Sequence, residues 1–316
     1  MLYFYITSCI FEDMQENLSL DSLIQSNNLE LLASQVVEGF ITGLHKSPFH
    51  GFSVEFAEHR IYNTGESTRH IDWKLFARTD KLFVKRYEEE TNLRCQVVID
   101  TSGSMFYPQE GLNKIKFSVY AAASLMHLLR KQRDANGLTL FDDDIHFHSE
   151  CKVSLTHLRL LFGKLNQLLQ TPQSAKSSNI AKGLHQLADR LHRRSLVIIF
   201  SDMFGSGEQN EEMFAALQHL RYNKHEVILF NVHDDKTEHQ FDFTNRPYLF
   251  VDSETGERIK LFPAQVKEQF LSSLEKYKQD IKVKCAQYKI DYVEANVGND
   301  FNQILLPFLI KRSKMV

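Results

Sequence analysis

The sequence predicts an α/β fold, with a doubly wound, mainly parallel sheet that follows a smaller N-terminal α+β segment. Three short apolar runs are typical of strands buried on both faces of a sheet, at residues 95–100, 195–202 and 225–232. Helical patterns alternate with these runs, at residues 114–130, 180–191 and 211–220. Because such alternation favours a parallel sheet, we expect an N-terminal segment over 1–92 and the sheet domain over 93–316.

The remaining elements follow from the same apolar periodicities. The N-terminal segment has a helical pattern over 18–45 and strand-like patterns at 49–56 and 81–87. For the rest of the sheet domain we expect, in chain order, a hairpin over 137–148, a helix over 155–169, a hairpin over 247–262, a helix over 263–288, a strand over 291–294 and a helix over 301–310.

Composition limits the classes of function. Hydrophobic residues make up 43% of the 316 residues and charged residues 24%, with a formal net charge of -3, so nothing favours nucleic acid or an anionic membrane surface as a partner. The four cysteines show no C-x-x-C pairing, which favours a reducing cytoplasm over a disulfide framework. No run of about 18 apolar residues occurs, so we expect no membrane span. The apolar opening at 1–11 lacks a basic start and a cleavage site, so we expect no signal peptide.

The main chemical motif comes directly after the first buried strand. Asp100 ends this strand, and Ser102 and Ser104 follow it in the pattern D-x-S-x-S. Alternate residues of an extended loop point the same way, so the carboxylate and the two hydroxyls can converge. The ligand crevice of an open α/β sheet lies beyond the carboxyl ends of its strands. Hard oxygen ligands of this kind suit Mg²⁺ rather than zinc or copper.

Two further segments add oxygen ligands at the same predicted edge. The strand 195–202 also ends on an aspartate, Asp202, and the loop before the helix 180–191 carries Ser178. The first and fourth strands of a right-handed wound sheet can be neighbours at the switch point. The candidate metal ligands are therefore Asp100, Ser102, Ser104, Ser178 and Asp202. The simpler interpretation is helix capping, since Asp and Ser are common where a strand turns into a helix.

The segment from 60 to 79 is unusually rich in charged and aromatic residues for a surface loop. Arginine can bind a carboxylate with two parallel hydrogen bonds, so we first interpret the segment as a salt-bridge scaffold locked against the sheet domain. The alternative is a groove for an anion or a protein partner. The residues on which this choice depends are Arg60, Tyr62, Glu66, Arg69, Asp72, Trp73 and Arg78.

Two resemblances narrow the interpretation. The stretch 97–105 resembles the metal-ion-dependent adhesion site of von Willebrand factor type A domains, and 198–202 is similar to the loop that supplies that family's aspartate. Ser178 stands where the family has a threonine, whose hydroxyl it can replace. The segment 51–79 resembles the signature of domain-of-unknown-function family fifty-eight, whose members join it to a von Willebrand A-like domain. This second resemblance covers about residues 35–260.

The resemblance implies a von Willebrand A-like, Rossmann-type sheet that holds Mg²⁺, with Mn²⁺ or Ca²⁺ as alternatives. It also implies a protein partner whose carboxylate fills the open position on the ion. The family is described alongside MoxR-type AAA+ ATPases in bacteria, which makes such an ATPase the implied partner. The leading hypothesis is thus a non-catalytic, Mg²⁺-dependent protein-interaction module, acting as an adaptor or partner of that ATPase.

Two rival hypotheses stay open at this point. The first is a metal-dependent phosphotransferase or hydrolase that uses Asp100, because a strand-end aspartate beside Mg²⁺ suits phosphoryl chemistry. Against it, a haloacid-dehalogenase-like site would need a second acid where Ser102 stands, and no lysine with a clear claim to steady a phosphoryl group appears near these loops. The second rival is a passive scaffold without a metal.

Three histidines are further candidates for functional residues. His146 and His148 lie near three aspartates on a predicted edge strand, where a second metal site is conceivable, but solubility of the edge explains them more simply. His233 follows the third buried strand and could act as a base, although a core or capping role is the simpler interpretation.

Overall fold

The computed structural model describes residues 29–43, 56–62, 71–87, 93–170, 180–192, 194–203, 208–252, 256–299 and 306–308. The chain divides into two compact units, one formed by Met1–Gly43 with Leu93–Val316 and the other by Leu44–Asn92. The helix α3 (Leu29–Gly43) packs on α5 (Lys114–Lys131) and belongs to the first unit. The sequence had placed α3 with the N-terminal segment.

The first unit contains a six-stranded, mainly parallel sheet, which confirms the predicted fold class. Its strand order is β10-β7-β6-β3-β4-β5, and all neighbouring pairs are parallel except β4 and β5, which form the predicted hairpin. The order changes direction between β3 and β6, the first and fourth strands of the sheet in the chain. The strands are β3 (Arg94–Asp100), β4 (Ala135–Phe141), β5 (Ile145–His148), β6 (Leu196–Ser201), β7 (Glu226–His233) and β10 (Asp291–Asn296).

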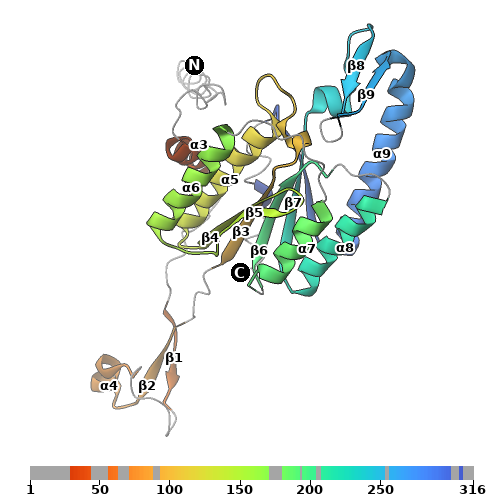
Figure 1. The fold of residues 1–316 in the computed structure, drawn as a ribbon. Helices are drawn as coiled ribbons and strands as arrows, with labels where there is room; N and C mark the ends of the chain where they lie inside the picture. Colours follow the sequence, from red (N-terminus) through yellow and green to blue (C-terminus); the bar gives the residue numbers. More distant parts are fainter. Residues whose placement is uncertain are drawn as a thin grey trace, which may run out of the picture. The chain divides into compact units, whose positions relative to one another are not determined.

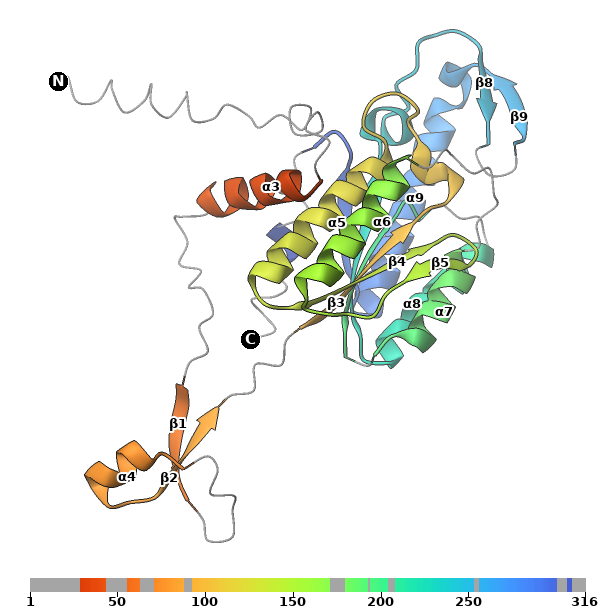
Figure 2. The ribbon, with the colours of Figure 1, turned by 60° about the vertical axis from the view of Figure 1, so that its left-hand side comes forward.

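Helices cover both faces of this sheet. One face carries α5 with α6 (Leu155–Gln170), and α3 lies beside them (Figures 1 and 2). The other face carries α7 (Ile180–Arg190), α8 (Glu208–Tyr222) and α9 (Pro263–Gln287). The predicted hairpin near 247–262 is formed by β8 (Tyr248–Val251) and β9 (Arg258–Leu261). Of the predicted helix 301–310, the structure describes residues 306–308 as helical.

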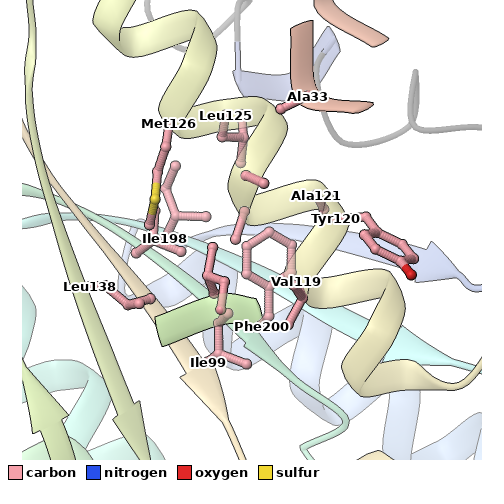
Figure 3. Packing of buried hydrophobic residues seen from close by; sticks show 14 of the residues in the cluster. Ala33, Ile99, Val119, Tyr120, Ala121, Leu125, Met126, Leu138, Ile198 and Phe200 are labelled. Atoms are coloured by element: carbon pink, nitrogen blue, oxygen red, sulfur yellow. The ribbon is translucent and has the colours of Figure 1, made fainter. Parts of the chain in front are cut away.

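The core explains why the central strands are continuous apolar runs. Along β3, Val97 and Ile99 face the α5 side while Val98 faces the α7 side, and all three side chains are fully buried. Strand β6 alternates in the same way. Figure 3 shows Ile99 and Phe200 from the sheet lying beneath Val119 of α5. A strand with helices on both faces has no solvent side, so polar alternation disappears.

The helix α5 is buried almost all round. It lies between the sheet and α3, so the alanines at 121, 122 and 123 are at most 1% exposed although they point in different directions. Figure 3 shows Ala33 of α3 against the outer side of α5 near Leu125. A helix that is apolar on every side is a buried helix. No described helix of the chain is both long enough and apolar enough to cross a membrane.

The second unit is small. Its strands β1 (Phe56–Ile61) and β2 (Phe83–Tyr87) pair antiparallel, and α4 (Trp73–Thr79) precedes β2. The predicted strand at 81–87 is confirmed by β2. The strand predicted at 49–56 meets the structure only at its last residue, where β1 begins; residues 49–55 lie outside the described part.

Candidate metal centre

The sheet topology brings the ends of β3 and β6 together. The two strands are parallel neighbours with Ile99 opposite Phe200, so Asp100 and Ser201 lie next to each other at the carboxyl edge. Both the amide and the hydroxyl of Thr101 donate to the carbonyl of Phe141, each at 2.8 Å, as the chain leaves the sheet. A short 3-10 helix, Gly103–Phe106, follows. The D-x-S-x-S motif therefore forms a tight loop at the switch point of the sheet.

Asp100 is held by two hydrogen bonds. Its Oδ1 accepts from the amide of Ser102 at 2.9 Å, and its Oδ2 accepts from the hydroxyl of Ser201 at 2.7 Å. The hydroxyls of Ser102 and Ser104 lie 3.1 Å apart, within hydrogen-bonding distance of each other. The loop thus gathers a buried carboxylate and two hydroxyls, as the alternation of the motif predicts. The capping interpretation receives no support at Ser102, whose side chain makes no cap bond to the short helix that follows it.

Asp202 is paired with a buried lysine. The ammonium of Lys114 donates to Oδ2 of Asp202 at 2.8 Å and to Oε1 of Glu238 at 2.7 Å. The side chains of Lys114 and Asp202 are each 1% exposed, and that of Glu238 is 15% exposed. Glu238 comes from the π-helical turn η4 (Asp235–His239), where its Oε2 also accepts from the amide of Asp234 at 2.7 Å.

Burial and charge control the protonation of these groups. Burial, together with the nearby carboxylate of Asp202, raises the pKa of Asp100 from 3.8 to about 7, against the lowering effect of its hydrogen bonds from Ser201 and Ser102. Burial lowers the pKa of the Lys114 ammonium, but the carboxylates of Asp202 and Glu238 outweigh it and raise this pKa above its ordinary value. Lys114 is therefore a permanent cation in this cluster.

Both signs of charge meet in this cluster. Among the described residues, the printed hydrogen bonds and charge interactions join the carboxylates of Asp100, Asp202 and Glu238 with the ammonium of Lys114. With these four groups ionised, carboxylates outnumber ammonium groups three to one in a buried setting, where like charges repel strongly. Protonation of Asp100 or binding of a divalent cation would relieve this excess. Carboxylate and hydroxyl oxygens are a donor set that fits a hard cation such as Mg²⁺.

The structure describes four of the five predicted ligands. It brings Asp100, Ser102 and Ser104 together in one loop and places Asp202 close enough to act on the charge of Asp100. Ser178 lies outside the described residues, so its place in the set stays a prediction.

Three residues of this cluster were missed by the sequence reasoning: Ser201, Lys114 and Glu238. The expectation that no lysine near these loops has a clear claim to steady a phosphoryl group stays a prediction, although Lys114, the first residue of α5, turns its side chain back into the site. A signal existed, since a cation in the first turn of a helix opposes the helix dipole and implies a tertiary partner. For Glu238 the sequence carries no comparable signal.

The structure describes part of the segment 60–79. Asp72 caps α4, because its Oδ1 accepts from the amides of Lys74 and Leu75 at 3.0 and 3.1 Å. The Nε of Arg78 donates to the carbonyl of Lys74 at 3.3 Å, within its own helix. Trp73 is 60% exposed. The side chain of Arg60, like Glu66 and Arg69, lies outside the described part, and the choice between scaffold and groove stays a prediction.

A family model matches this arrangement of segments. It covers residues 58–279, more than half of the chain, and is described as Protein of unknown function DUF58. The chain belongs to this family. The match spans both the signature segment and the sheet up to α9, so the DUF58 resemblance drawn from the motif at 51–79 is confirmed.

The chain is also similar to curated proteins of two mycobacteria. The uncharacterized proteins Mb1516 of Mycobacterium bovis and Rv1480 of Mycobacterium tuberculosis are each 24% identical over 208 residues, 66% of this chain. The chain spans 64% of the length of these relatives.

Solved structures with a similar fold are more distant still. The conserved hypothetical protein BatB from Bacteroides thetaiotaomicron has a TM-score of 0.42 at 13% identity, covering 71% of this chain and 100% of that one. The VWA domain of SpRpn10 has a TM-score of 0.36 at 11% identity, covering 68% of this chain and 94% of that one. The fold class rests on the strand order of this chain itself.

Proposed function

We propose that this DUF58 protein is a non-catalytic, Mg²⁺-dependent protein-interaction module. In this proposal Asp100, Ser102, Ser104, Ser178 and Asp202 hold the ion, and a carboxylate of a protein partner completes its shell. The observation that carries the proposal is the convergence of the buried Asp100 carboxylate with the hydroxyls of Ser102 and Ser104, close to the carboxylate of Asp202. Mn²⁺ and Ca²⁺ are oxygen-seeking alternatives to Mg²⁺.

Each described residue has a distinct part in this proposal. Ser201 and the amide of Ser102 orient the Asp100 carboxylate, and Lys114 orients that of Asp202. The two serine hydroxyls offer neutral oxygens, so the site keeps a net charge that one divalent ion balances. A balanced ion attracts a partner carboxylate more weakly than a bare one, which suits reversible contact.

The partner that we propose is a MoxR-type AAA+ ATPase. Its support is the likeness of the 51–79 segment to the DUF58 signature. The exposure of Trp73 and Ile61, at 60% and 66%, gives the second unit apolar surface that a protein partner can cover. We propose a reducing cytoplasm as the setting, because the four cysteines are far apart in the sequence and show no C-x-x-C pairing.

Calorimetry with Mg²⁺ tests the metal site. The double variant Asp100→Ala with Ser102→Ala should lose Mg²⁺ binding while its far-UV circular dichroism stays native. Asp144→Ala is the matched control, because Asp144 lies at the same edge but pairs with Lys182 at the surface. Unchanged Mg²⁺ affinity in the double variant would contradict the assignment of Asp100 and Ser102 as Mg²⁺ ligands.

A binding assay with a MoxR-type ATPase tests the partner. Capture of the ATPase by the full chain should be lost when a chelator removes Mg²⁺ and in the double variant, and it should persist in Asp144→Ala. Capture that is indifferent to both chelator and double variant would place the contact elsewhere on the chain.

One observation favours the enzymatic alternative enough to test it. Lys114 puts a cation beside Asp202, and a cation near the reacting groups is what phosphoryl chemistry requires. Against it, Asp100 is fully buried with both oxygens hydrogen-bonded, and the ammonium is taken by two carboxylates. Release of phosphate from an aryl phosphate with Mg²⁺, lost in Asp100→Asn, would favour a phosphotransferase or hydrolase.

A further inference from the structure

A second cluster of metal-ligating side chains lies at the end of β7, outside the candidate metal centre. It consists of His233, the last residue of β7, with Asp235 and His239 from the turn η4. One ligand atom from each of the three lies within 4.8 Å of the others. The side chains of His233 and His239 are 6% and 9% exposed, and Asp235, at 39%, opens the cluster to solvent.

The hydrogen bonds of this cluster reveal where its lone pairs point. Nδ1 of His233 lies 3.2 Å from the carbonyl of Asn231, which only accepts, so Nδ1 carries the proton and Nε2 is a lone pair. Nδ1 of His239 lies 3.0 Å from the ammonium of Lys278, which only donates, so this Nδ1 is also a lone pair.

Both of these nitrogens lie near the same carboxylate oxygen. Oδ1 of Asp235 lies 3.3 Å from Nδ1 of His239 and 4.0 Å from Nε2 of His233. Two ligands of one tetrahedral zinc ion, each at about 2.1 Å from the metal, lie about 3.4 Å apart. Three acceptor atoms at such spacings repel one another unless a cation lies among them. In this structure Lys278 supplies a cation at one of the three.

Neighbouring groups hold the three side chains in place. The imidazole rings of His233 and His239 stack with centroids 3.7 Å apart. The other oxygen of Asp235, Oδ2, accepts from Nε2 of Gln240 at 3.0 Å, and the carbonyl of Asn231 orients His233. Outer groups of this kind fix the tautomer and direction of metal ligands. A π-helical turn, which often marks a functional site, carries two of the three.

We propose that His233, Asp235 and His239 form a binding site for a divalent transition metal ion of the zinc or cobalt class, and that the ion displaces the Lys278 ammonium. Imidazole nitrogens select such metals over Mg²⁺, so this site differs in chemistry from the all-oxygen centre beside Asp100. Lys278 is half-buried on α9 and can turn toward solvent when the ion enters. With three protein ligands, the ion keeps an open position for water or an outside donor.

Visible absorption of Co²⁺ bound to the full chain tests this site. We expect the wild-type protein to bind Co²⁺ in the presence of excess Mg²⁺, with Zn²⁺ competing. His239→Ala should weaken Co²⁺ binding by about 10-fold or more. His219→Ala is the matched control, since its imidazole also lies near another histidine, His185, and near a carboxylate, Asp189. Its Co²⁺ affinity should stay unchanged.

Lys278→Met keeps the test decisive if His239→Ala fails to fold, because removal of the competing ammonium should tighten Co²⁺ binding. The Asp100→Ala, Ser102→Ala double variant should bind Co²⁺ normally, which separates this proposal from that of the Mg²⁺ centre. The proposal is overturned if the wild type gives no Co²⁺ spectrum. It is equally overturned if His219→Ala loses the spectrum while His239→Ala keeps it, or if Lys278→Met weakens binding.

Discussion

Two clusters at the carboxyl edge of the sheet each contain one lysine ammonium, but they hold it differently. Lys114 is 1% exposed and lies between two carboxylates at 2.8 and 2.7 Å. Lys278 is half-buried and contacts a neutral imidazole nitrogen at 3.0 Å. A charge–charge contact in a buried setting is far stronger than a contact with a neutral acceptor.

The two lysines differ in whether a metal ion can displace the ammonium from its cluster. Removing the Lys114 ammonium would take away the cation that Asp202 and Glu238 contact in a buried setting. We therefore expect Lys114 to stay in place when a metal ion binds at Asp100. Lys278 leaves behind two neutral rings and a solvent-open carboxylate, so a metal ion can take its place. One cluster therefore uses lysine as a fixed component, and the other uses it as a replaceable cation.

The largest expected effect separates the two lysines directly. Lys114→Met should destabilise the fold by about 3–5 kcal/mol, because it leaves buried carboxylates without their cation. Lys278→Met, the matched control, should change the free energy of unfolding by less than about 1 kcal/mol. Urea unfolding of both variants measures this difference. Equal losses would show that the two clusters do not differ in the way described.

The second effect concerns pH in the metal-free protein. Because burial raises the pKa of Asp100 from 3.8 to about 7, the folded state holds this proton more tightly than the unfolded state does. Protonated Asp100 contributes fully to the free energy of unfolding below about pH 4. This contribution is lost as the pH rises through 7, and its size is about 1.4 kcal/mol for each unit by which the pKa is raised. Unfolding in chelator at pH 5 and pH 8 should therefore show a less stable protein at pH 8.

Asp100→Asn is the control for this pH effect. Its amide can accept from the amide of Ser102 and donate to the hydroxyl of Ser201, so the fold is kept without the charge. We expect the variant to be more stable than wild type at pH 8 in chelator. Its free energy of unfolding should also lack most of the decrease between pH 5 and pH 8, which is the slope of stability with pH. Burial also raises the pKa of Glu238, so a smaller slope of the same sign persists. A full slope in Asp100→Asn would contradict the assignment.

The smallest effect distinguishes two serines of the candidate centre. Ser201→Ala removes a buried hydroxyl that donates to Asp100 and accepts from the amide of Met203, which should cost about 1–3 kcal/mol. Ser104→Ala should leave unfolding nearly unchanged, because its hydroxyl is half-buried and contacts another hydroxyl. It should instead weaken Mg²⁺ binding, measured by calorimetry. Reversed roles would move Ser104 out of the proposed ligand set.

The elements of the sheet unit were predictable because each has a strong local pattern. The runs at 95–100 and 195–202 are mostly apolar, with continuous apolar stretches at 97–99 and 196–200, and the structure confirms them as the buried strands β3 and β6. The helix α3 was given its correct type but placed with the wrong neighbours, since periodicity identifies an apolar face without identifying what covers it. The covering element, α5, lies some 70 residues further along the chain.

The sequence by itself determined that the carboxylate and hydroxyls of the D-x-S-x-S loop converge, because neighbouring residues at alternate positions point the same way whatever the rest of the fold does. Only the tertiary structure decided the charges around them. Lys114, Glu238 and Asp202 meet from three distant elements, and Lys278 reaches His239 from a fourth. Electrostatic energy depends on the distance between charges in space and on their burial, and a local sequence pattern determines neither of these.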